Sequence, residues 1–469
     1  MGVVTRFAPS PTGYMHIGNL RTALYSYLIA KNRGGKFILR IEDTDKNRYV
    51  SGATDLIYKT LESSGLKYDE EYVQSNRLDI YKRYAEELVK NGKAYYCFCE
   101  EAKSDIDTYR EECNYTTGVG YNRHCRNLTQ EEVAEKLKNN LPYCIRQKIE
   151  DDILVEYEDV VYGKLTFNSS QLDDQVLIKR DGYPTYNFAN VIDDHLMNIT
   201  DIVRGNEYLS STPKYVLLYK SFGWEVPNFI HLPVINGMDE EGNVTKLSKR
   251  HGSVSFEELL CQGYLSEAII NYIVFLGWNP KTCKEIYSLT ELEKEFDVKK
   301  INKSDMIFDY KKLDWYNSHY MKQIEFDKFV EMTKRYYNHD KLELICSYIQ
   351  NKIVKFSDIE KELEFLGSIK DFDLTLYENK KNDVKIDDVR KFLLYMIEQL
   401  ENIDFTKEEV EKVIRMYCVE NGVKFGHGMW IYRIALSGRK NTIIGGLEIG
   451  EILGKEEVLN RLQKELKRV

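Results

Sequence analysis

The chain has 469 residues, enough for roughly three domains at about 150 residues each, and more than one hydrophobic core normally serves. Lys and Arg number 66 against 75 Asp and Glu, so the formal net charge is −9 at pH 7. This balance does not suggest a nucleic-acid-binding protein, because wholesale phosphate binding usually shows as a basic excess. Hydrophobic residues make up 43% and charged residues 30%, which excludes wholesale disorder.

The sequence has no segment typical of membrane insertion or secretion. Its longest nearly apolar stretch, Ala268 to Trp278, falls well short of the roughly 20 residues that span a bilayer. The first residues lack a cationic region followed by an apolar one, so we expect no signal peptide. Nine cysteines at irregular spacing fit reduced thiols better than a disulfide framework. We therefore expect a cytoplasmic protein with no membrane partner.

The first 41 residues predict a βαβ unit. Val3–Ala8 is rich in β-branched and aromatic residues and is closed by a Pro-rich segment, 9–13, which predicts a strand and a tight loop. His16 to Asn32 has apolar residues on one helical face, and Lys36–Ile41 predicts a second strand. This order begins a parallel α/β sheet, and its first loop lies at the carboxyl edge, where ligands bind.

Less regular sequence follows, and the chain ends in predicted helices. Residues 80–190, in which four of the nine cysteines lie within Cys97–Cys125, indicate an insertion into the first domain. Tyr186–Asp194 and Phe229–Ile235 are candidate strands that would complete the sheet. From about residue 255 the pattern turns helical, and residues 322–469 carry apolar side chains at helical spacing. The clearest example is Val389, Phe392, Leu393, Met396 and Leu400.

Two short segments have residue types that suit a nucleoside triphosphate. His16-Ile17-Gly18-Asn19 lies at a strand-to-helix junction, where backbone N–H groups and the helix dipole favour phosphate. Gly18 lets a ring lie against the helix, and His16 can donate a hydrogen bond to a phosphoryl oxygen. Lys246-Leu247-Ser248-Lys249 can bracket phosphates with charge-assisted bonds. Either segment alone is more often an ordinary helix start or a solvated basic turn.

Together these segments resemble the HIGH and KMSKS signatures of class I aminoacyl-tRNA synthetases. Asn19 replaces the second His, and Leu247 and Arg250 replace the Met and the last Ser. Longer strings narrow the resemblance to the bacterial-type glutamyl-tRNA synthetase family, over nearly the whole chain. These strings are RFAPSPTG at 6–13, LRIEDTD at 39–45, PTYNFANVIDD at 184–194, VRG at 203–205, and segments at 308–315, 424–426 and 435–438.

The resemblance implies an α/β fold with a Rossmann-like catalytic domain in two halves, 1–80 and 190–254. An acceptor-end-binding domain would be inserted at 81–189, and a helical stem-contact domain, 255–321, and an all-helical anticodon-binding region, 322–469, would follow. It also implies ATP- and Mg²⁺-dependent conversion of L-glutamate to glutamyl adenylate and transfer to the 3′ end of tRNA-Glu. Charging of tRNA-Gln stays open, and the family expectation is a monomer.

The resemblance further implies roles for single residues. Glu42 would pair with the substrate ammonium, and Arg6 and Arg204 would hold its side-chain carboxylate, which a guanidinium binds bidentately. The alternative for Glu42 and Arg204 is a structural ion pair. Tyr208 departs from the Trp or His often found there. Supporting glutamate positions are Ala8, Ser10 and Tyr186. The residues assigned to catalysis at the phosphates are His16, Lys246 and Lys249. The residues assigned to ATP are His16, Gly18, Asn19, Glu207, Leu232 and Lys249.

A cysteine group resembles the zinc knuckle of some family members. Cys97, Cys99 and Cys125 offer three thiolates for a tetrahedral zinc ion. Related enzymes complete the set with a His two residues after the last Cys or a Tyr four residues before it. Position 127 is Asn127, so Tyr121 is the expected fourth ligand. The alternatives are His124, Cys113, or free thiols without a metal.

Other functions share part of this pattern. A truncated relative that glutamylates queuosine in tRNA has no anticodon-binding part, and glutaminyl-tRNA synthetase has a β-barrel there, whereas this segment is predicted to be helical. A catalytically silent binding protein on the same scaffold would be expected to lose His16, Lys249 or Glu42, and all three are present. A nucleotidyltransferase that shared only the two signatures would not need Arg6 and Arg204 as a pair.

Overall fold

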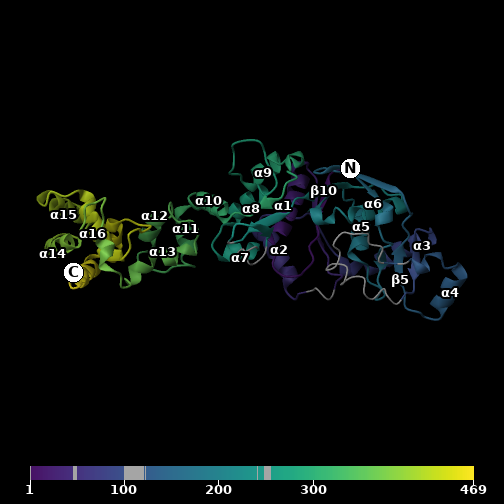
Figure 1. Cartoon of the computed structure of the whole chain (residues 1–469), viewed down its shortest axis with the longest axis horizontal. Coiled ribbons are helices and arrows are strands. Elements are labelled where there is room, and N and C mark those ends of the chain that lie inside the picture. Colours follow the sequence, from purple (N-terminus) through teal and green to yellow (C-terminus); the bar gives the residue numbers. More distant parts are fainter. Residues whose placement is uncertain (1, 46–49, 100–120, 122, 240, 248–254) are drawn as a thin grey trace. The chain divides into compact units, whose positions relative to one another are not determined.

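The computed structural model of the chain describes residues 2–45, 50–99, 121, 123–239, 241–247 and 255–469. The chain forms two compact units, and Figure 1 traces both along the sequence. Unit 1 comprises Met1–Leu259 and Ile269–Asp309. Unit 2 comprises Leu260–Ala268 and Tyr310–Val469. No helix among the described residues is long and apolar enough to cross a membrane.

The βαβ unit predicted at the start of unit 1 is confirmed. Strands β1 (Val4–Phe7), β2 (Lys36–Ile41) and β3 (Glu70–Val73) are parallel and lie in the order β1-β2-β3. Helix α1 (Ile17–Asn32) joins the first two strands and is buried along most of its length. It ends where Gly34 adopts φ 61°, a left-handed conformation that glycine adopts without steric cost.

A second group of parallel strands continues this layer. Strand β9 (Asp201–Gly205) pairs in parallel with β10 (Asn228–Leu232). The β9 group adjoins β1, because the Val4 N–H donates to Thr200 Oγ1 at 2.9 Å and the Thr200 N–H donates to the Val4 carbonyl at 2.9 Å. The resulting order, β3-β2-β1-β9-β10, is that of a Rossmann-like sheet, so the carboxyl ends of these strands meet at one edge.

The prediction of strands at 186–194 is wrong, since α5 (Tyr186–Leu196) is a helix. Phe188, Val191 and Ile192 have helical spacing and are buried against α6 (Thr212–Phe222). A short run of apolar and β-branched residues suits a buried strand or a buried helix, and tertiary packing decides between them. The strand expected at Phe229–Ile235 is divided by Pro233, which lacks an N–H for the ladder, into β10 and β11.

The segment between the two halves of the layer has its own antiparallel sheet, in the order β4-β5-β8. A hairpin from the same segment, β6 and β7, extends the main sheet in the order β7-β6-β10-β9. The bounds are α2 (Ala53–Ser63), α3 (Leu78–Lys90), β4 (Ala94–Cys97), α4 (Gln130–Lys138), β5 (Cys144–Gln147), β6 (Leu154–Asp159), β7 (Gly163–Asn168) and β8 (Val176–Ile178). After β11 (Ile235–Met238) come β12 (Val244–Lys246), α7 (Phe256–Cys261), α8 (Ser266–Val274), α9 (Leu289–Glu295) and β13 (Met306–Ile307).

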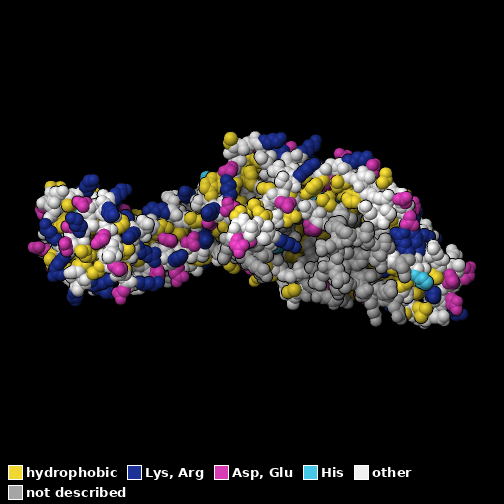
Figure 2. Space-filling view, in the orientation of Figure 1, with side chains coloured by type: hydrophobic (Ala, Val, Ile, Leu, Met, Phe, Trp, Pro, Cys, Tyr) yellow, Lys and Arg dark blue, Asp and Glu magenta, His cyan; other side chains and the backbone are white. Residues whose placement is uncertain are grey.

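Unit 2 is helical where the structure describes it, as predicted for the C-terminal residues. The five apolar residues singled out between Val389 and Leu400 are all buried on one face of α14 (Ile386–Glu401). Figure 2 shows Lys and Arg side chains interspersed with Asp and Glu over the visible face of this unit. Its helices are α10 (Tyr310–Met321), α11 (Phe326–Thr333), α12 (Leu342–Ile349), α13 (Asp358–Gly367), α14 (Ile386–Glu401), α15 (Lys407–Glu420), α16 (Phe425–Ser437), α17 (Gly446–Leu453) and α18 (Lys455–Leu466).

Candidate active site

A buried network of charges joins β1, β2 and α5. Asp194 Oδ1 accepts hydrogen bonds from Arg6 Nε at 3.0 Å and from Arg40 Nη1 at 2.7 Å. Burial by itself would raise the pKa of Asp194, but the charges of Arg6, Arg40 and Arg204 outweigh it and hold that pKa below its ordinary value. Asp194 is therefore ionised and fixes the two guanidinium groups beside each other.

Glu42 follows β2 and is held by Arg40 through one of its two oxygens. Arg40 Nε and Nη2 donate to Glu42 Oε1 at 3.2 and 3.1 Å. The other oxygen, Oε2, is buried and accepts no hydrogen bond from the residues that the structure describes. Burial raises the pKa of Glu42 to about 7, against the opposing charges of Arg40 and Arg6. A buried carboxylate with a free oxygen is costly unless a cationic group completes its bonding.

Arg204, near the carboxyl end of β9, has the complementary deficiency. Its guanidinium is buried, and Nε and Nη1 donate to no acceptor within the described chain. The rings of Tyr208 and Tyr215 lie 5.1 and 5.0 Å from it. Asn190 Oδ1 accepts hydrogen bonds from Arg40 Nη2 at 3.1 Å and from Arg6 Nη2 at 3.4 Å. Its amide nitrogen, Nδ2, is buried and donates to no acceptor among the described residues. These donors suit a carboxylate ligand.

The Pro-rich loop lies against this network. The Glu42 N–H donates to the Pro9 carbonyl at 3.0 Å, which holds the Ala8-Pro9-Ser10 segment at the carboxyl end of β2. Tyr186 begins α5 with its ring centroid 5.7 Å from that of Tyr208. All six residues predicted for glutamate therefore lie in unit 1, near the carboxyl ends of β1, β2 and β9 or at the start of α5. These residues are Arg6, Ala8, Ser10, Glu42, Tyr186 and Arg204.

His16 caps helix α1. Its Nδ1 accepts the Gly18 N–H at 3.0 Å, so in the neutral ring the proton is on Nε2. Burial lowers the pKa of His16, a hydrogen bond with the Leu247 backbone opposes the shift, and the charge of Lys246 adds to it. A Cβ at Gly18 would lie 3.3 Å from His16 Nδ1, so glycine leaves this helix start uncrowded. The neutral imidazole can donate from Nε2 to an oxygen anion that takes the place of the Leu247 backbone as acceptor.

The described residues of the second signature, Lys246 and Leu247, lie close to His16 of the first. The Leu247 backbone forms a hydrogen bond with His16, and the Lys246 charge lies close enough to affect its pKa. Further along the chain, Ser255 forms an antiparallel β-bridge with His16. The Phe256 N–H donates to the Met15 carbonyl at 3.2 Å. Lys249, the residue expected to bear most on phosphate charge, lies outside the described residues, as do Ser248 and Arg250.

The remaining residues predicted for ATP lie at the ends of β9 and β10 and at the start of α1. Leu232 pairs with Gly205 at these ends. The Glu207 carboxylate lies over Gly205, because a Cβ there would fall 2.0 Å from Glu207 Oε2. Asn19 is exposed in the first turn of α1. The predicted ATP residues that the structure describes thus lie on strand ends and a helix start that share one edge of the sheet.

Three polar residues of the network are missing from the sequence-based assignment: Arg40, Asn190 and Asp194. Two signals were available. Arg40 and Glu42 are two residues apart, which directs both side chains to one face of a strand. Asn190 and Asp194 follow Tyr186 at intervals of four, which places them on one face of a helix. The second signal was hidden because this segment was predicted to be a strand.

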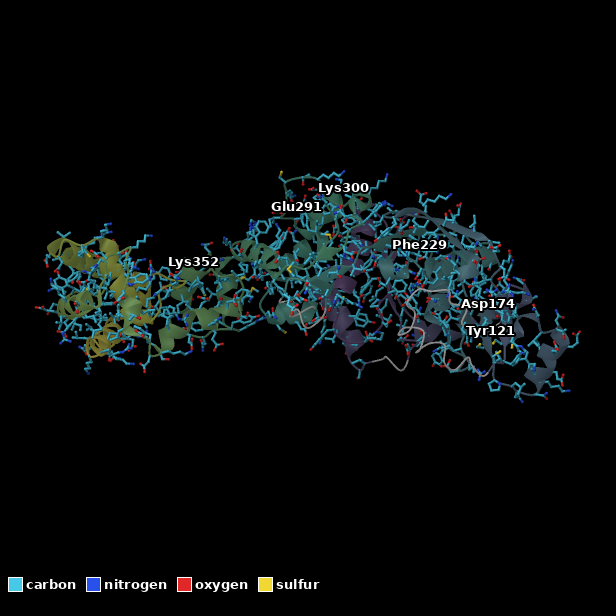
Figure 3. The ribbon with its side chains drawn as sticks, viewed as in Figure 1. Tyr121, Asp174, Phe229, Glu291, Lys300 and Lys352 are labelled. Carbon is cyan, nitrogen blue, oxygen red and sulfur yellow. The ribbon has the colours of Figure 1, made fainter. Side chains whose placement is uncertain are left out.

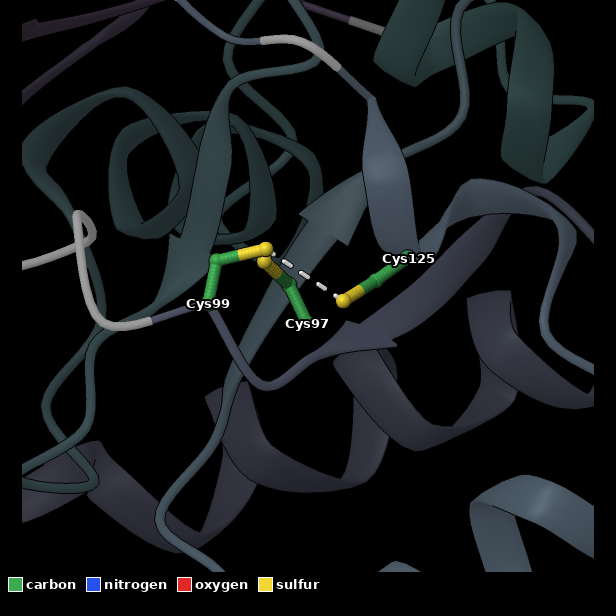
Figure 4. A group of neighbouring side chains, drawn as sticks. All are labelled: Cys97, Cys99 and Cys125. Atoms are coloured by element: carbon green, nitrogen blue, oxygen red, sulfur yellow. Dashed lines mark hydrogen bonds between the residues drawn. The ribbon is translucent and has the colours of Figure 1, made fainter.

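A second candidate site lies in the inserted segment. The Sγ atoms of Cys97, Cys99 and Cys125 all lie within 4.8 Å of one another, and Figure 4 shows the three side chains converging. Cys99 Sγ lies 3.4 Å from Cys125 Sγ, along the dashed line. The Tyr121 hydroxyl lies 3.1 Å from Cys97 Sγ and 4.0 Å from Cys99 Sγ. Tetrahedral zinc with Zn–S bonds of about 2.3 Å requires Sγ atoms about 3.8 Å apart, so this donor set fits zinc.

Buried charges surround this cysteine group. The Arg146 guanidinium lies 3.8 Å from the Tyr121 ring centroid and donates to the Asp174 carbonyl at 3.0 Å, and Figure 3 places Tyr121 and Asp174 in the inserted segment. A hydrogen bond with Cys144 outweighs burial and lowers the pKa of Cys97 to about 4. Burial and the neighbouring Cys125 thiol raise the pKa of Cys99 to about 12. The Cys97 thiolate is thus favoured without a metal, whereas a bound cation would be needed to ionise Cys99.

Comparison with known families divides the chain into two matched segments. Residues 2–315 match the family described as "tRNA synthetases class I (E and Q), catalytic domain". Residues 328–466 match the family described as "Anticodon binding domain". The first match contains both signatures and the buried charge network, and the second lies within unit 2.

The chain is also similar to individual proteins over its whole length. It is 48% identical over 480 residues to the glutamate–tRNA ligase of Clostridium novyi, covering 98% of this chain and 97% of the relative. It is 47% identical to the glutamate–tRNA ligase of Clostridium acetobutylicum, with the same coverage. The crystal structure of a glutamate tRNA ligase from Elizabethkingia meningosepticum in complex with its amino acid superposes with a TM-score of 0.85 at 34% identity, covering 100% of this chain and 99% of that one.

Proposed function

The chain belongs to the glutamate–tRNA ligase family of class I tRNA synthetases, and we propose that it joins L-glutamate to the 3′ end of tRNA-Glu. The reaction has two steps. The substrate α-carboxylate attacks the α-phosphate of ATP to give glutamyl adenylate and pyrophosphate. The terminal ribose hydroxyl of the tRNA then attacks the acyl carbon and releases AMP. Neither step requires a protein nucleophile, so the protein positions groups and stabilises charge.

The pattern of unused polar atoms in the buried network carries this proposal. Within the part of the chain that the structure describes, Glu42 Oε2 is a free acceptor, and Arg204 Nε and Nη1 and Asn190 Nδ2 are free donors. Glutamate presents an ammonium to the first and carboxylate oxygens to the others. Glutamine has no side-chain charge and would leave the Arg204 guanidinium poorly paired, which is the kind of mismatch that gives large selectivity.

The ATP side follows from the position of His16. Its Nε2 donates to a phosphoryl oxygen as negative charge develops, while Lys246 and Lys249 supply positive charge. Asn19 and Gly18 face the nucleotide at the start of α1, and Glu207 and Leu232 contact its ribose and adenine. Mg²⁺ bound with ATP offsets triphosphate charge.

Further features of the proposal concern tRNA and zinc. Residues 81–189 bind the acceptor end, 255–321 contact the stem, and 322–469 bind the anticodon. A structural zinc ion is held by three cysteines and a tyrosine of the inserted segment, and it stabilises the fold there. The protein acts in the cytoplasm as a monomer. The zinc ligands are Cys97, Cys99, Tyr121 and Cys125.

ATP–pyrophosphate exchange tests the proposal. Purified protein is incubated with ATP, Mg²⁺ and labelled pyrophosphate, with tRNA-Glu present and with either glutamate or glutamine. Label should enter ATP with glutamate and not measurably with glutamine. Absence of exchange from folded protein would contradict the proposal, and aminoacylation of tRNA-Glu and tRNA-Gln in parallel defines the tRNA range.

A further inference from the structure

Arg40 has no hydrogen-bond donor left for a substrate. A guanidinium carries five N–H groups, one on Nε and two on each Nη. Its Nε donates to Glu42, Nη1 donates to Asp194 and to Met197 Sδ at 3.6 Å, and Nη2 donates to Glu42 and Asn190. The side chain is fully buried. Any effect of Arg40 on the reaction must therefore pass through the groups that it binds.

Those groups are the ones that the proposed function gives to glutamate. Both Arg40 bonds to Glu42 end on Oε1, which leaves Oε2 as the free oxygen of that carboxylate. Both arginine bonds to Asn190 end on Oδ1, which leaves Nδ2 as its free donor. Asp194 joins Arg40 to Arg6 through a single oxygen. Arg40 thus decides which atom of Glu42 stays available and, together with Arg6, which atom of Asn190 does.

We propose that Arg40 is a positioning residue for glutamate: it orients the free oxygen of Glu42 and the free amide of Asn190 and places a positive charge beside the Glu42 carboxylate. This inference rests on the proposed function. Arg40 makes no contact with substrate in this assignment, and the bonds that it makes require a planar fork, which lysine cannot supply.

The electrostatic part of the proposal depends on all the charges that face Glu42. Arg6 of β1, Arg40 of β2 and Asp194 of α5 act on it, and Tyr186 of α5 lies within its field. Of the two cations, Arg40 lowers the pKa of Glu42 more. Loss of a cation at this distance typically raises a carboxyl pKa by about 1–3 units. Without Arg40, Glu42 would therefore be largely neutral at pH 7 and would bind an ammonium poorly.

Steady-state exchange assays of Arg40→Gln and Arg40→Lys, from pH 6 to 9, test this inference in the full-length protein. For Arg40→Gln we expect the KM for glutamate at pH 7 to rise about tenfold or more, with the KM for ATP within about twofold. The pH at which kcat/KM for glutamate rises should move up by about 1–3 units. Arg40→Lys keeps the charge, so its pH profile should stay near that of the wild type while its KM for glutamate still rises.

Arg461→Gln is the matched control. Arg461 of α18 is another buried arginine, and it donates to the carbonyls of Phe365, Leu366 and Leu436. Arg461→Gln should leave the KM for glutamate and the pH profile of kcat/KM unchanged. An Arg40→Lys protein that folds and keeps the wild-type KM for glutamate would overturn the inference even if Arg40→Gln does not fold, as would equal increases in both KM values. Wild-type protein without exchange would overturn the proposed function itself, and with it this inference.

Discussion

Replacing Glu42 by Gln should stabilise unit 1 while weakening glutamate binding. The pKa of Glu42 is about 7 in the folded chain against an ordinary value of 4.5, because burial penalises the charge. Above pH 7 the Glu42 carboxylate is ionised in both states, but in the folded state it is buried and in the unfolded state it is in water. The difference of about 2.5 pKa units corresponds to about 3 kcal/mol of lost stability. Glutamine has a similar shape and carries no such cost.

The sign of the pH dependence follows from linkage. Between pH 4.5 and 7 the folded carboxyl retains a proton that the unfolded one has released, so stability falls as the pH rises through this window and levels off above it. Glu42→Gln removes this fall. The advantage of the variant in free energy of unfolding should therefore grow by about 2 kcal/mol between pH 5.5 and pH 8.

Urea unfolding at the two pH values measures this difference, with tryptophan fluorescence as the signal, since Trp224 and Trp278 lie in unit 1 with Glu42. The exposed Glu62→Gln is the control and should change stability by a similar small amount at both pH values. In exchange assays Glu42→Gln should raise the KM for glutamate about 30-fold or more. A variant that is less stable than wild type by an amount that grows with pH would refute the reasoning, since the carboxylate would then be net stabilising.

Three further predictions concern the other sites. His16→Ala should lower kcat for exchange by about 10²–10³-fold with little change in the KM for ATP, if His16 acts mainly on developing phosphate charge; a change confined to KM would contradict this role. Gly205→Ala should raise the KM for ATP, because its Cβ would fall 2.0 Å from Glu207 Oε2 and displace that side chain, and an unchanged KM would remove Glu207 from the nucleotide site. Elemental analysis should find one equivalent of zinc in the wild-type protein and none in Cys125→Ser, and the variant should have a lower Tm. Wild-type protein that contains no zinc, although zinc was supplied during its production, would refute the metal site.

Local sequence patterns were sufficient to predict helices and strands in which apolar residues recur at regular spacing or β-branched and aromatic residues cluster. Strand β2 matches its predicted bounds, and the apolar residues predicted on one face of α14 are buried there. The prediction fails at α5, which is buried nearly all round. Its polar face, with Asn190 and Asp194, packs into the buried charge network instead of facing solvent, so the helical spacing was not recognised as that of a surface helix.

The candidate site was predictable only in part, for a related reason. Arg6, Glu42 and Arg204 could be assigned by resemblance, but the residues between them could not, since contacts such as that of Arg6 with Asp194 join positions 188 residues apart. The raised pKa of Glu42 also depends on burial by α5 and the neighbouring strands, which no local pattern encodes. The resemblance identifies residues proposed to contact the ligand, such as Glu42. The structure identifies the residues, such as Arg40, that hold these ligand-binding side chains in place.

The net charge of −9 was a poor guide to nucleic-acid binding, because it averages over the whole surface, whereas binding depends on the local electrostatic field. The buried network illustrates this difference: its four arginines (Arg6, Arg40, Arg77 and Arg204) face three carboxylates (Glu42, Asp193 and Asp194), which leaves one excess positive charge inside an acidic protein. Glutamate carries one net negative charge at pH 7 and would balance that excess, while glutamine carries none. The same reasoning applies to tRNA, because Lys and Arg side chains interspersed with acidic ones, as in Figure 2, can contact phosphates singly. Affinity for tRNA should then depend only modestly on salt and draw more on contacts with unstacked bases.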